Sequence, residues 1–335
     1  MTMQKICILG AGAMGCLMGG LIQRAGYDVT YIARGSQLQA LRSRGLTLTT
    51  AGDQWRGEVH ATDRAEEAGP QDAVIISTKA HQLPGVLPQL PPLLHANTVI
   101  VPAVNGVPWW YFQKEGGPYD GRRLDGLDPE GKLTAQIAPE RIIGCVNYLA
   151  GHISNPGEVR YVPDIERRIV LGELDGQMTP RLQALATAFE KAGFAPKSSD
   201  NIRQIVWHKL WGNIAFNPIG ALTHGTIDQV AEGYQDIDLL SAVMNEARFI
   251  ADKLGIELGQ TIKSRVEAAA KMRGHKTSMQ QDIESGRATE IEAIVGAVRE
   301  IGKWMEVDTP HLNALYSLVK LKERFFIEAM KTRRA

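Results

Sequence analysis

Residues 4–15 read QKICILGAGAMG, and this stretch decides the fold of the chain. The apolar run Ile6 to Leu9 is typical of a strand buried on both faces, and Ala13 to Arg24 has the pattern of an amphipathic helix packed against it. The turn between them carries three glycines, Gly10, Gly12 and Gly15. A strand, a glycine-rich turn and a helix in this order predict a dinucleotide-binding unit; the alternative is an ordinary glycine-rich turn.

Each glycine has its own expected role in such a unit. Gly10 allows the tight turn, Gly12 lets the backbone approach a pyrophosphate, and Gly15 lets helix and strand touch. The free N–H groups at the start of the helix then hold the anion. A second strand, Asp28 to Ala33, falls where a βαβ unit requires it. We therefore assign the whole turn to the cofactor: Gly10, Ala11, Gly12, Ala13, Met14 and Gly15.

The residue after the second strand indicates which cofactor binds. An NAD enzyme usually has Asp or Glu at this point, but this chain has Arg34. A guanidinium favours the 2′-phosphate of NADP(H) through paired, charge-assisted hydrogen bonds, so we expect NADP(H). The alternative is that Arg34 is a solvated surface cation. Lys79 and Gln82, which follow the apolar run Ala73 to Ser77, are further cofactor candidates, although each alone fits a surface residue as well.

Length and composition describe an ordinary globular protein. The 335 residues suit two domains, 44% are hydrophobic and 22% charged, and 37 basic residues balance 37 acidic ones. This balance points to neither nucleic acid nor membrane as a partner. The uncharged stretch Ala80 to Gln113 contains six prolines, which forbid a continuous helix, so we expect buried strand and loops there. No secretory signal is visible, and we expect a cytoplasmic protein.

The cysteines and histidines follow no site pattern. Cys7, Cys16 and Cys145 show no CxxC spacing, and the eight histidines form no HxxxH or HExxH motif. We expect free, buried thiols in a reducing compartment and no metal site.

Apolar runs in the first half alternate with helical or irregular segments, which predicts a mostly parallel, doubly wound sheet. The runs are residues 5–9, 28–33, 73–77, 98–101 and 142–148. Three later runs and one helix are expected to complete this sheet as a more antiparallel portion. They are the runs 158–162, 168–172 and 194–197 and the helix 179–191. Residues 113–139, rich in Gly, Asp and Lys, are expected to form an exposed insertion.

From Asp200 onward the pattern is helical, which predicts a second, all-helical domain. Its helices are expected at residues 202–216, 236–254, 261–272, 289–305 and 310–331. The long last helix is a candidate for a homodimer seam.

The segment WHKLWGNIAFNP, residues 207–218, carries a polar stripe. Lys209, Asn213 and Asn217 are spaced at i, i+4 and i+8, which places them on one face of a helix. Two asparagines are poor helix formers, which argues for a purpose; the alternative is a solvated helix face. Pro218 is expected to end or kink the helix at Asn217.

This stripe suits the reduction of a ketone by hydride. Negative charge develops on the carbonyl oxygen, and a positioned ammonium both stabilises that charge and donates the proton. Lys209 suits this role, with a pKa that desolvation in a closed site would lower.

Two more polar residues have plain structural explanations. Glu290 follows Thr289, which with Glu292 fits a T-x-x-E capping box. Ser278 with Gln281 fits another. Neither Glu290 nor Ser278 would be chosen as a site residue from local pattern alone.

Several motifs together resemble the ketopantoate reductase (2-dehydropantoate 2-reductase) family over nearly the whole chain, from about residue 4 to 331. They are GAGAMG at 10–15, Arg34, STKAHQ with Lys79, VNG with Asn105, HKLWGNIAFNP with Lys209, SMQQDI with Ser278 and TEIE with Glu290. The resemblance implies an α/β protein with an N-terminal Rossmann-like dinucleotide-binding sheet domain, residues 1–199. A C-terminal all-helical substrate and catalytic domain, residues 200–335, would follow, with the active site between them.

The implied activity is NADPH-dependent reduction of the 2-keto acid ketopantoate to pantoate, in pantothenate biosynthesis. Lys209 would donate the proton, and Glu290, the second catalytic residue, would help to orient cofactor or substrate. The implied substrate ligands are Asn105, Lys209, Asn213, Asn217 and Ser278. The implied cofactor contacts beyond the glycine turn are Arg34, Lys79, Gln82, Asn105, Ala150 and Glu290.

The chain also departs from the family pattern. Four consecutive aromatics, Trp109 to Phe112, follow the VNG motif, and the insertion 113–139 comes directly after them. These residues either reshape the substrate mouth or pack in the core. Two alternatives therefore stay open: an NADPH-dependent reductase of a different 2-keto acid, and a non-catalytic NADP(H)-binding sensor.

Overall fold

The computed structural model describes residues 3–50, 52–162, 167–233 and 238–334. The chain forms two compact units. The first unit consists of Met1–Val104, Trp110–Arg123 and Glu130–Ile202, and the second of Asn105–Trp109, Leu124–Pro129 and Arg203–Ala335. The main change of unit falls at Ile202, and the second unit also takes two short pieces from the first half of the chain.

The first unit is built on a five-stranded parallel sheet with the order β5-β2-β1-β6-β7. Its strands are β1 (Lys5–Leu9), β2 (Asp28–Ile32), β5 (His60–Thr62), β6 (Ala73–Ile76) and β7 (Val99–Pro102). The direction of winding reverses between β1 and β6, and ligands of such sheets bind beyond the carboxyl ends of the strands at this point. The predicted doubly wound sheet is confirmed.

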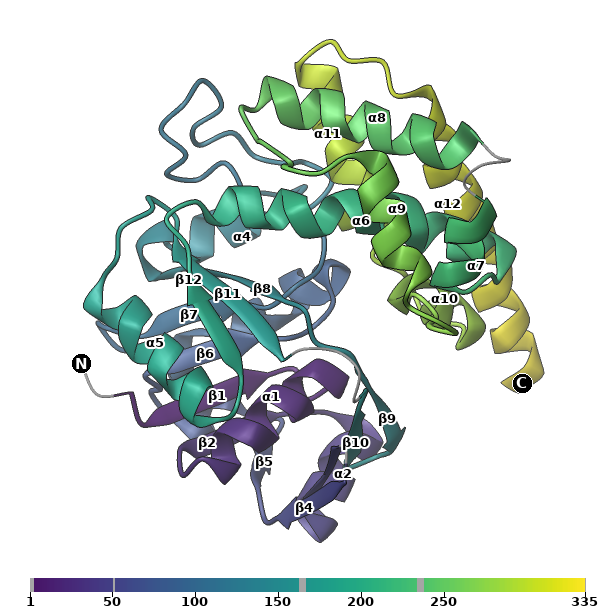
Figure 1. The fold of residues 1–335 in the computed structure, drawn as a ribbon. Coiled ribbons are helices and arrows are strands. Elements are labelled where there is room, and N and C mark those ends of the chain that lie inside the picture. Colours follow the sequence, from purple (N-terminus) through teal and green to yellow (C-terminus); the bar gives the residue numbers. More distant parts are fainter. Residues whose placement is uncertain (1–2, 51, 163–166, 234–237, 335) are drawn as a thin grey trace. The chain divides into compact units, whose positions relative to one another are not determined.

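Helix α1 (Ala13–Arg24) packs closely on this sheet. Gly19 makes the approach possible, because a Cβ at this position would lie 2.6 Å from the ring of Tyr31 and 2.8 Å from Ile8. Both of these residues are fully buried in the core of the unit. Helix α5 (Pro180–Lys191) lies beside α1 (Figure 1), and Thr179 caps it by accepting from the Leu182 amide.

Residues 143–147, 168–173 and 195–198 form a sheet of their own. We expected the run 142–148 within the mostly parallel sheet and the other two runs as its extension, so the structure differs from the prediction for all three. Strand β8 (Ile143–Asn147) is linked to β7 by the single bridge Ile100–Ile142. It pairs antiparallel with β11 (Arg168–Glu173), which pairs parallel with β12 (Ala195–Ser198). The antiparallel character that we predicted for this region is thus present at one of its two pairings.

Strand β10 (Glu158–Tyr161) departs further from the prediction, because it belongs to a third sheet with the order β4-β3-β10-β9. Its partners are β3 (Leu46–Thr50), β4 (Asp53–Gly57) and β9 (Gly151–Asn155). Val159 pairs with Leu48, and both side chains are buried. Both residues join the core cluster that also contains α1 and the main sheet, so this third sheet packs against the same helix as the first.

The uncharged stretch 80–113 contains 3-10 helices in addition to the expected strand. They are η1 (Ala80–Gln89) and η2 (Pro91–Leu93). Short 3-10 turns accommodate Pro84 and Pro88, which would disrupt a longer α-helix.

The insertion 113–139 is exposed only in part. Leu124, Leu133 and Ile137 are buried, and in the second unit the Glu300 carboxylate accepts from the amides of Asp125 and Gly126. The composition of the segment did not predict these buried side chains or the hydrogen bonds to Glu300. The remaining short elements of the first unit are α2 (Gly35–Arg44), α3 (Ala65–Ala68), α4 (Lys132–Gln136) and η3 (Pro139–Arg141).

The regular elements that the structure describes in the second unit are helices. They are α6 (Ile202–Thr223), α7 (Ile227–Glu232), α8 (Asp238–Lys253), α9 (Ile262–Ala270), α10 (Ser278–Glu284), the π-helical turn η5 (Glu292–Gly296), α11 (Ala297–Trp304) and α12 (Pro310–Arg334). The predicted start of one helix at Asp236 lies outside the described residues. Of the helices that the structure describes, none combines the length and the apolar character needed to cross a membrane.

The sequence predicts that Pro218 ends or kinks α6 at Asn217, and of these two outcomes the end is wrong. The helix continues through Pro218 to Thr223. A proline removes one backbone hydrogen bond and crowds the preceding turn. Here Ile214, Phe216 and Pro218 are all buried, so the packing of this segment outweighs the local cost.

We predict that Gly15→Ala destabilises the first unit, because the new Cβ would lie 2.2 Å from the Gly10 carbonyl oxygen and 2.4 Å from Ser77 Oγ. The expected loss is about 1–3 kcal/mol in the free energy of unfolding, measured by urea titration. Gly12→Ala is the matched control, because a Cβ there meets nothing within 4 Å. Equal stability of the two variants would contradict the packing role of Gly15.

Candidate active site

The glycine turn lies at the switch point of the five-stranded sheet. Gly10 has φ +107°, a conformation that favours glycine, and Ser77 at the end of β6 donates to its carbonyl at 2.7 Å. Gly12 precedes the first residue of α1 and has open space where a side chain would be. No side chain caps the start of α1, and unpaired amides at a helix start suit a phosphate group.

Arg34, Lys79 and Gln82 all follow strands of this sheet. Arg34 is exposed at the start of α2, directly after β2, and Lys79 begins η1 after β6. The Gln82 side chain accepts from the Lys79 amide at 3.3 Å. The parallel strands β2 and β6 flank β1, so these residues stand at the carboxyl edge that also carries the glycine turn. Ala150 is half-buried, and a Cβ on the next residue, Gly151, would lie 3.5 Å from Met14 of the turn.

The second unit joins three candidate residues in one chain of hydrogen bonds. Lys209 Nζ on α6 donates to Asn105 Oδ1 at 2.8 Å, and Asn105 Nδ2 donates to Glu290 Oε2 at 3.1 Å. Asn105 lies just after β7, and Glu290 lies just before η5. Lys209 and Asn105 are half-buried, whereas Glu290 is 7% exposed. The amide thus presents its oxygen to the lysine and its NH₂ to the carboxylate.

Backbone hydrogen bonds of the π-helical turn η5 hold the segments that carry Asn105 and Glu290. The Val107 amide donates to the Ala293 carbonyl at 2.8 Å, and the Ile294 amide donates to the Glu290 carbonyl at 3.0 Å. Gly106, at φ +82°, is pressed so closely to η5 that a Cβ would lie 2.4 Å from the Ala293 oxygen. The turn therefore fixes the backbone on both sides of the Asn105–Glu290 hydrogen bond. Single π-turns within helices are frequent at functional sites.

The capping box predicted for Thr289 and Glu292 is wrong. The Glu292 carboxylate accepts instead from the hydroxyl of Tyr316 on α12 at 2.6 Å. Burial, together with this carboxylate, raises the pKa of Tyr316 to about 12, so the hydroxyl remains a donor at neutral pH. Thr289 donates its hydroxyl to Glu323 at 2.6 Å. Glu290 precedes the helix and is left to face Asn105.

The polar stripe of α6 is continuous, because the helix is unbroken. Asn213 is half-buried, and Asn217 is 6% exposed. Ser278 is exposed at the first residue of α10, and the cap is Thr277, which accepts from the Gln280 amide, so the box predicted for Ser278 is wrong. A Cβ on Gly220 of α6 would lie 3.5 Å from Thr277. The start of α10 therefore adjoins the last turns of α6.

The sequence reasoning missed Gly106, Tyr316 and the π-turn. The Asn-Gly dipeptide of VNG signals a special turn, but nothing local pairs it with a segment almost two hundred residues later. The aromatic block does not line an opening, because Trp109, Trp110, Tyr111 and Phe112 are all buried.

Comparison with known proteins identifies relatives along nearly the whole chain. The family described as "Ketopantoate reductase PanE/ApbA" matches residues 6–108, and "Ketopantoate reductase PanE/ApbA C terminal" matches residues 201–323. A 2-dehydropantoate 2-reductase of Mesorhizobium japonicum is 41% identical over 317 residues, which cover 94% of this chain and 97% of that protein.

Solved structures give the same result. A protein of Ralstonia solanacearum assigned as a ketopantoate reductase superposes with a TM-score of 0.92 at 37% identity, covering 97% of this chain and 99% of the other. A 2-dehydropantoate 2-reductase of Geobacter metallireducens superposes with a TM-score of 0.82 at 28% identity, covering 95% of this chain and 99% of the other.

We predict that Gly106→Ala separates the Asn105 turn from η5. The new Cβ would meet the Ala293 carbonyl, and the residue would have to keep a positive φ, so we expect a loss of about 2–4 kcal/mol in the free energy of unfolding. Urea unfolding measures the loss. Gly85→Ala in η1, where a Cβ meets nothing within 4 Å, is the control. Unchanged stability in Gly106→Ala would show that η5 does not hold the turn.

Proposed function

Because the chain belongs to the ketopantoate reductase family, we propose that it reduces 2-dehydropantoate to pantoate with NADPH. The observation that carries the proposal is the hydrogen-bonded chain from Lys209 through Asn105 to Glu290. It presents an ammonium that donates to the Asn105 amide oxygen at 2.8 Å, and a positioned proton donor of this kind suits general-acid catalysis. A protein that only bound the nucleotide would have no need of such a donor.

The residues of the first unit fit NADPH. The open space at Gly12 and the first amides of α1 suit the pyrophosphate, and the exposed Arg34 after β2 suits the 2′-phosphate. Lys79, Gln82 and Ala150 are proposed as further contacts. NADPH, when bound, supplies the hydride. We propose that the first unit holds this cofactor and that the second supplies the acid and the substrate ligands.

The role proposed for Lys209 is to donate one proton to the C2 carbonyl oxygen as hydride reaches C2. The C=O bond becomes H–C–O–H, and Lys209 is left as a neutral amine that regains its proton from water. Asn105 keeps its amide oxygen on the lysine because its NH₂ group is engaged by Glu290. In this proposal Glu290 orients the Asn105 amide. Asn105 then contacts both Lys209 and the nicotinamide of the bound cofactor.

Three polar residues of α6 and α10 are proposed to hold the substrate. Asn213 and Asn217, which share a face with Lys209, would bind the substrate hydroxyl. Ser278, exposed at the start of α10, would donate to the carboxylate. All four side chains of the aromatic block are buried, which favours packing over contact with a different 2-keto acid.

We also propose a cytoplasmic enzyme that forms a homodimer. The three cysteines are free thiols and all are buried, which suits a reducing compartment. On α12, Leu318, Leu321 and Phe325 are each at least half exposed and are spaced to share one face, which supports this helix as the seam.

We predict that Lys209→Ala lowers kcat about 10²- to 10⁴-fold, the usual contribution of a positioned general acid, while the Kd for NADPH is unchanged. The rate is followed as loss of NADPH absorbance with ketopantoate, and the Kd by cofactor fluorescence. Lys303→Ala, at an exposed lysine of α11, is the control. A kcat near the wild-type value in Lys209→Ala would overturn the catalytic assignment.

We predict that Arg34→Gln raises the Kd for NADPH about 10-fold or more, the effect of losing a charge-assisted hydrogen bond. NADH lacks the 2′-phosphate and serves as the internal control, so its Kd is expected to stay the same. Isothermal titration with both cofactors measures the ratio. An equal effect on both would place Arg34 away from the ribose phosphate.

A further inference from the structure

His224 adopts a backbone conformation that is unusual for its residue type. It directly follows α6, has φ +60°, and donates its amide to the Gly220 carbonyl at 2.9 Å. This is the left-handed position that ends many helices, and glycine is the usual residue there because a Cβ is unfavourable. Glycine would close the same turn without strain, so capping alone does not explain a histidine. A strained residue of this kind calls for an explanation in its side chain.

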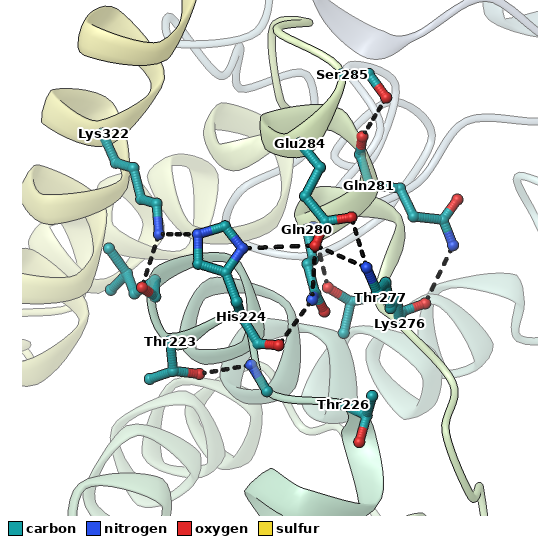
Figure 2. A network of polar contacts seen from close by, with 12 residues as sticks. Thr223, His224, Thr226, Lys276, Thr277, Gln280, Gln281, Glu284, Ser285 and Lys322 are labelled. Atoms are coloured by element: carbon teal, nitrogen blue, oxygen red, sulfur yellow. Dashed lines mark hydrogen bonds and ion pairs between the residues drawn. The ribbon is translucent and has the colours of Figure 1, made fainter.

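The imidazole of His224 lies between two oppositely charged side chains (Figure 2). Lys322 on α12 lies 2.9 Å from Nε2, and Glu284 on α10 lies 3.5 Å from Nδ1. Lys322 also donates to the Leu222 carbonyl at 2.7 Å in the last turn of α6. An ammonium only donates, so Nε2 accepts, and the ring proton resides on Nδ1, toward the carboxylate. With this assignment the ring accepts from α12 and donates to α10.

The carboxylate that faces the ring is firmly held. Lys276 Nζ donates to both oxygens of Glu284, at 2.9 and 2.8 Å, and these hydrogen bonds hold the pKa of Glu284 below its usual value. Burial lowers the pKa of Lys322. Three charged side chains near the ring are labelled in Figure 2: Lys322 on α12, Glu284 on α10 and Lys276 just before α10.

The backbone of His224 contacts the same helix as its ring does. Gln280 on α10 is completely buried, and its Nε2 donates to the His224 carbonyl at 3.0 Å and to Glu284 Oε1 at 3.1 Å. Gln280 lies two residues after Ser278, in the first turn of α10. His224 therefore contacts α10 near both of its ends: its carbonyl accepts from Gln280, and its ring lies against Glu284.

We propose that His224 is a positioning residue for the substrate, which sets α10, and with it Ser278, against the end of α6. The proposal rests on the proposed function, in which Ser278 binds the carboxylate of the keto acid. Helix α6 carries Lys209, and α10 carries Ser278, so the distance between acid and carboxylate ligand depends on how the two helices are joined. The His224 hydrogen bonds join them within the second unit.

Comparison of His224→Gly with Glu306→Gly tests the proposal. Glu306 is also a non-glycine residue at positive φ, 54°, just after α11, and it is exposed. Glycine relieves the same backbone strain at both positions, so neither variant is expected to lower Tm by that change. A role limited to capping predicts that the two variants behave alike.

We expect His224→Gly alone to loosen α10 and weaken substrate binding. Hydrogen–deuterium exchange of residues 278–284 should rise about 10-fold or more, and KM for ketopantoate should rise by a similar factor with kcat little changed. In a Ser278→Ala background the KM effect of His224→Gly should largely disappear, because the two substitutions act through the same contact.

The outcomes separate this proposal from the proposed function. If His224→Gly matches Glu306→Gly in both exchange and KM, or if exchange rises while KM does not, the positioning role is wrong. A full KM effect that persists in the Ser278→Ala background would also overturn it. If the wild-type protein fails to reduce ketopantoate, the proposed function fails, and unchanged exchange in α10 would then refute the link between His224 and α10 independently.

Discussion

One side-chain amide organises the candidate site. Asn105 has one acceptor and one donor group, and it lies between a lysine and a buried glutamate. Turning the amide over would set NH₂ against the ammonium and oxygen against the carboxylate, so only one orientation is favourable. Glu290 thereby determines which atom meets Lys209. The proposed acid is thereby linked to Glu290 through the Asn105 amide.

The backbone around Asn105 shows how this orientation is maintained. A π-turn widens the helix at Glu292–Gly296, and the Ala293 carbonyl becomes the acceptor of the Val107 amide. Gly106 makes the contact possible, because no other residue type leaves room at that distance. Asn105 comes from the loop after the last strand of the parallel sheet, yet it belongs to the helical unit. A loop from the first half of the chain is thus built into the second unit.

The predictable features are those encoded within one element. The glycine turn, α1 and the polar stripe of α6 all follow from residue types at fixed spacings, and the structure has them at the expected positions. The features that sequence reasoning missed depend on partners far away in the chain. The Thr289–Glu292 pattern is a sound local capping signal, but Tyr316, from another helix, takes up the Glu292 carboxylate. Likewise β10 pairs with β3, more than a hundred residues earlier.

At Pro218, too, tertiary packing outweighs a local preference, and here the result affects the proposed chemistry. A helix that broke at Asn217 would free Asn217 from the face that it shares with Lys209 and Asn213. Burial of Ile214, Phe216 and Pro218 keeps the helix intact, so Lys209, Asn213 and Asn217 follow one another along one face at intervals of about one turn. The helix then ends at Thr223, and the carbonyl of the next residue, His224, accepts from Gln280 of α10. A single continuous helix therefore carries Lys209, the proposed proton donor, together with Asn213 and Asn217, two of the proposed substrate ligands.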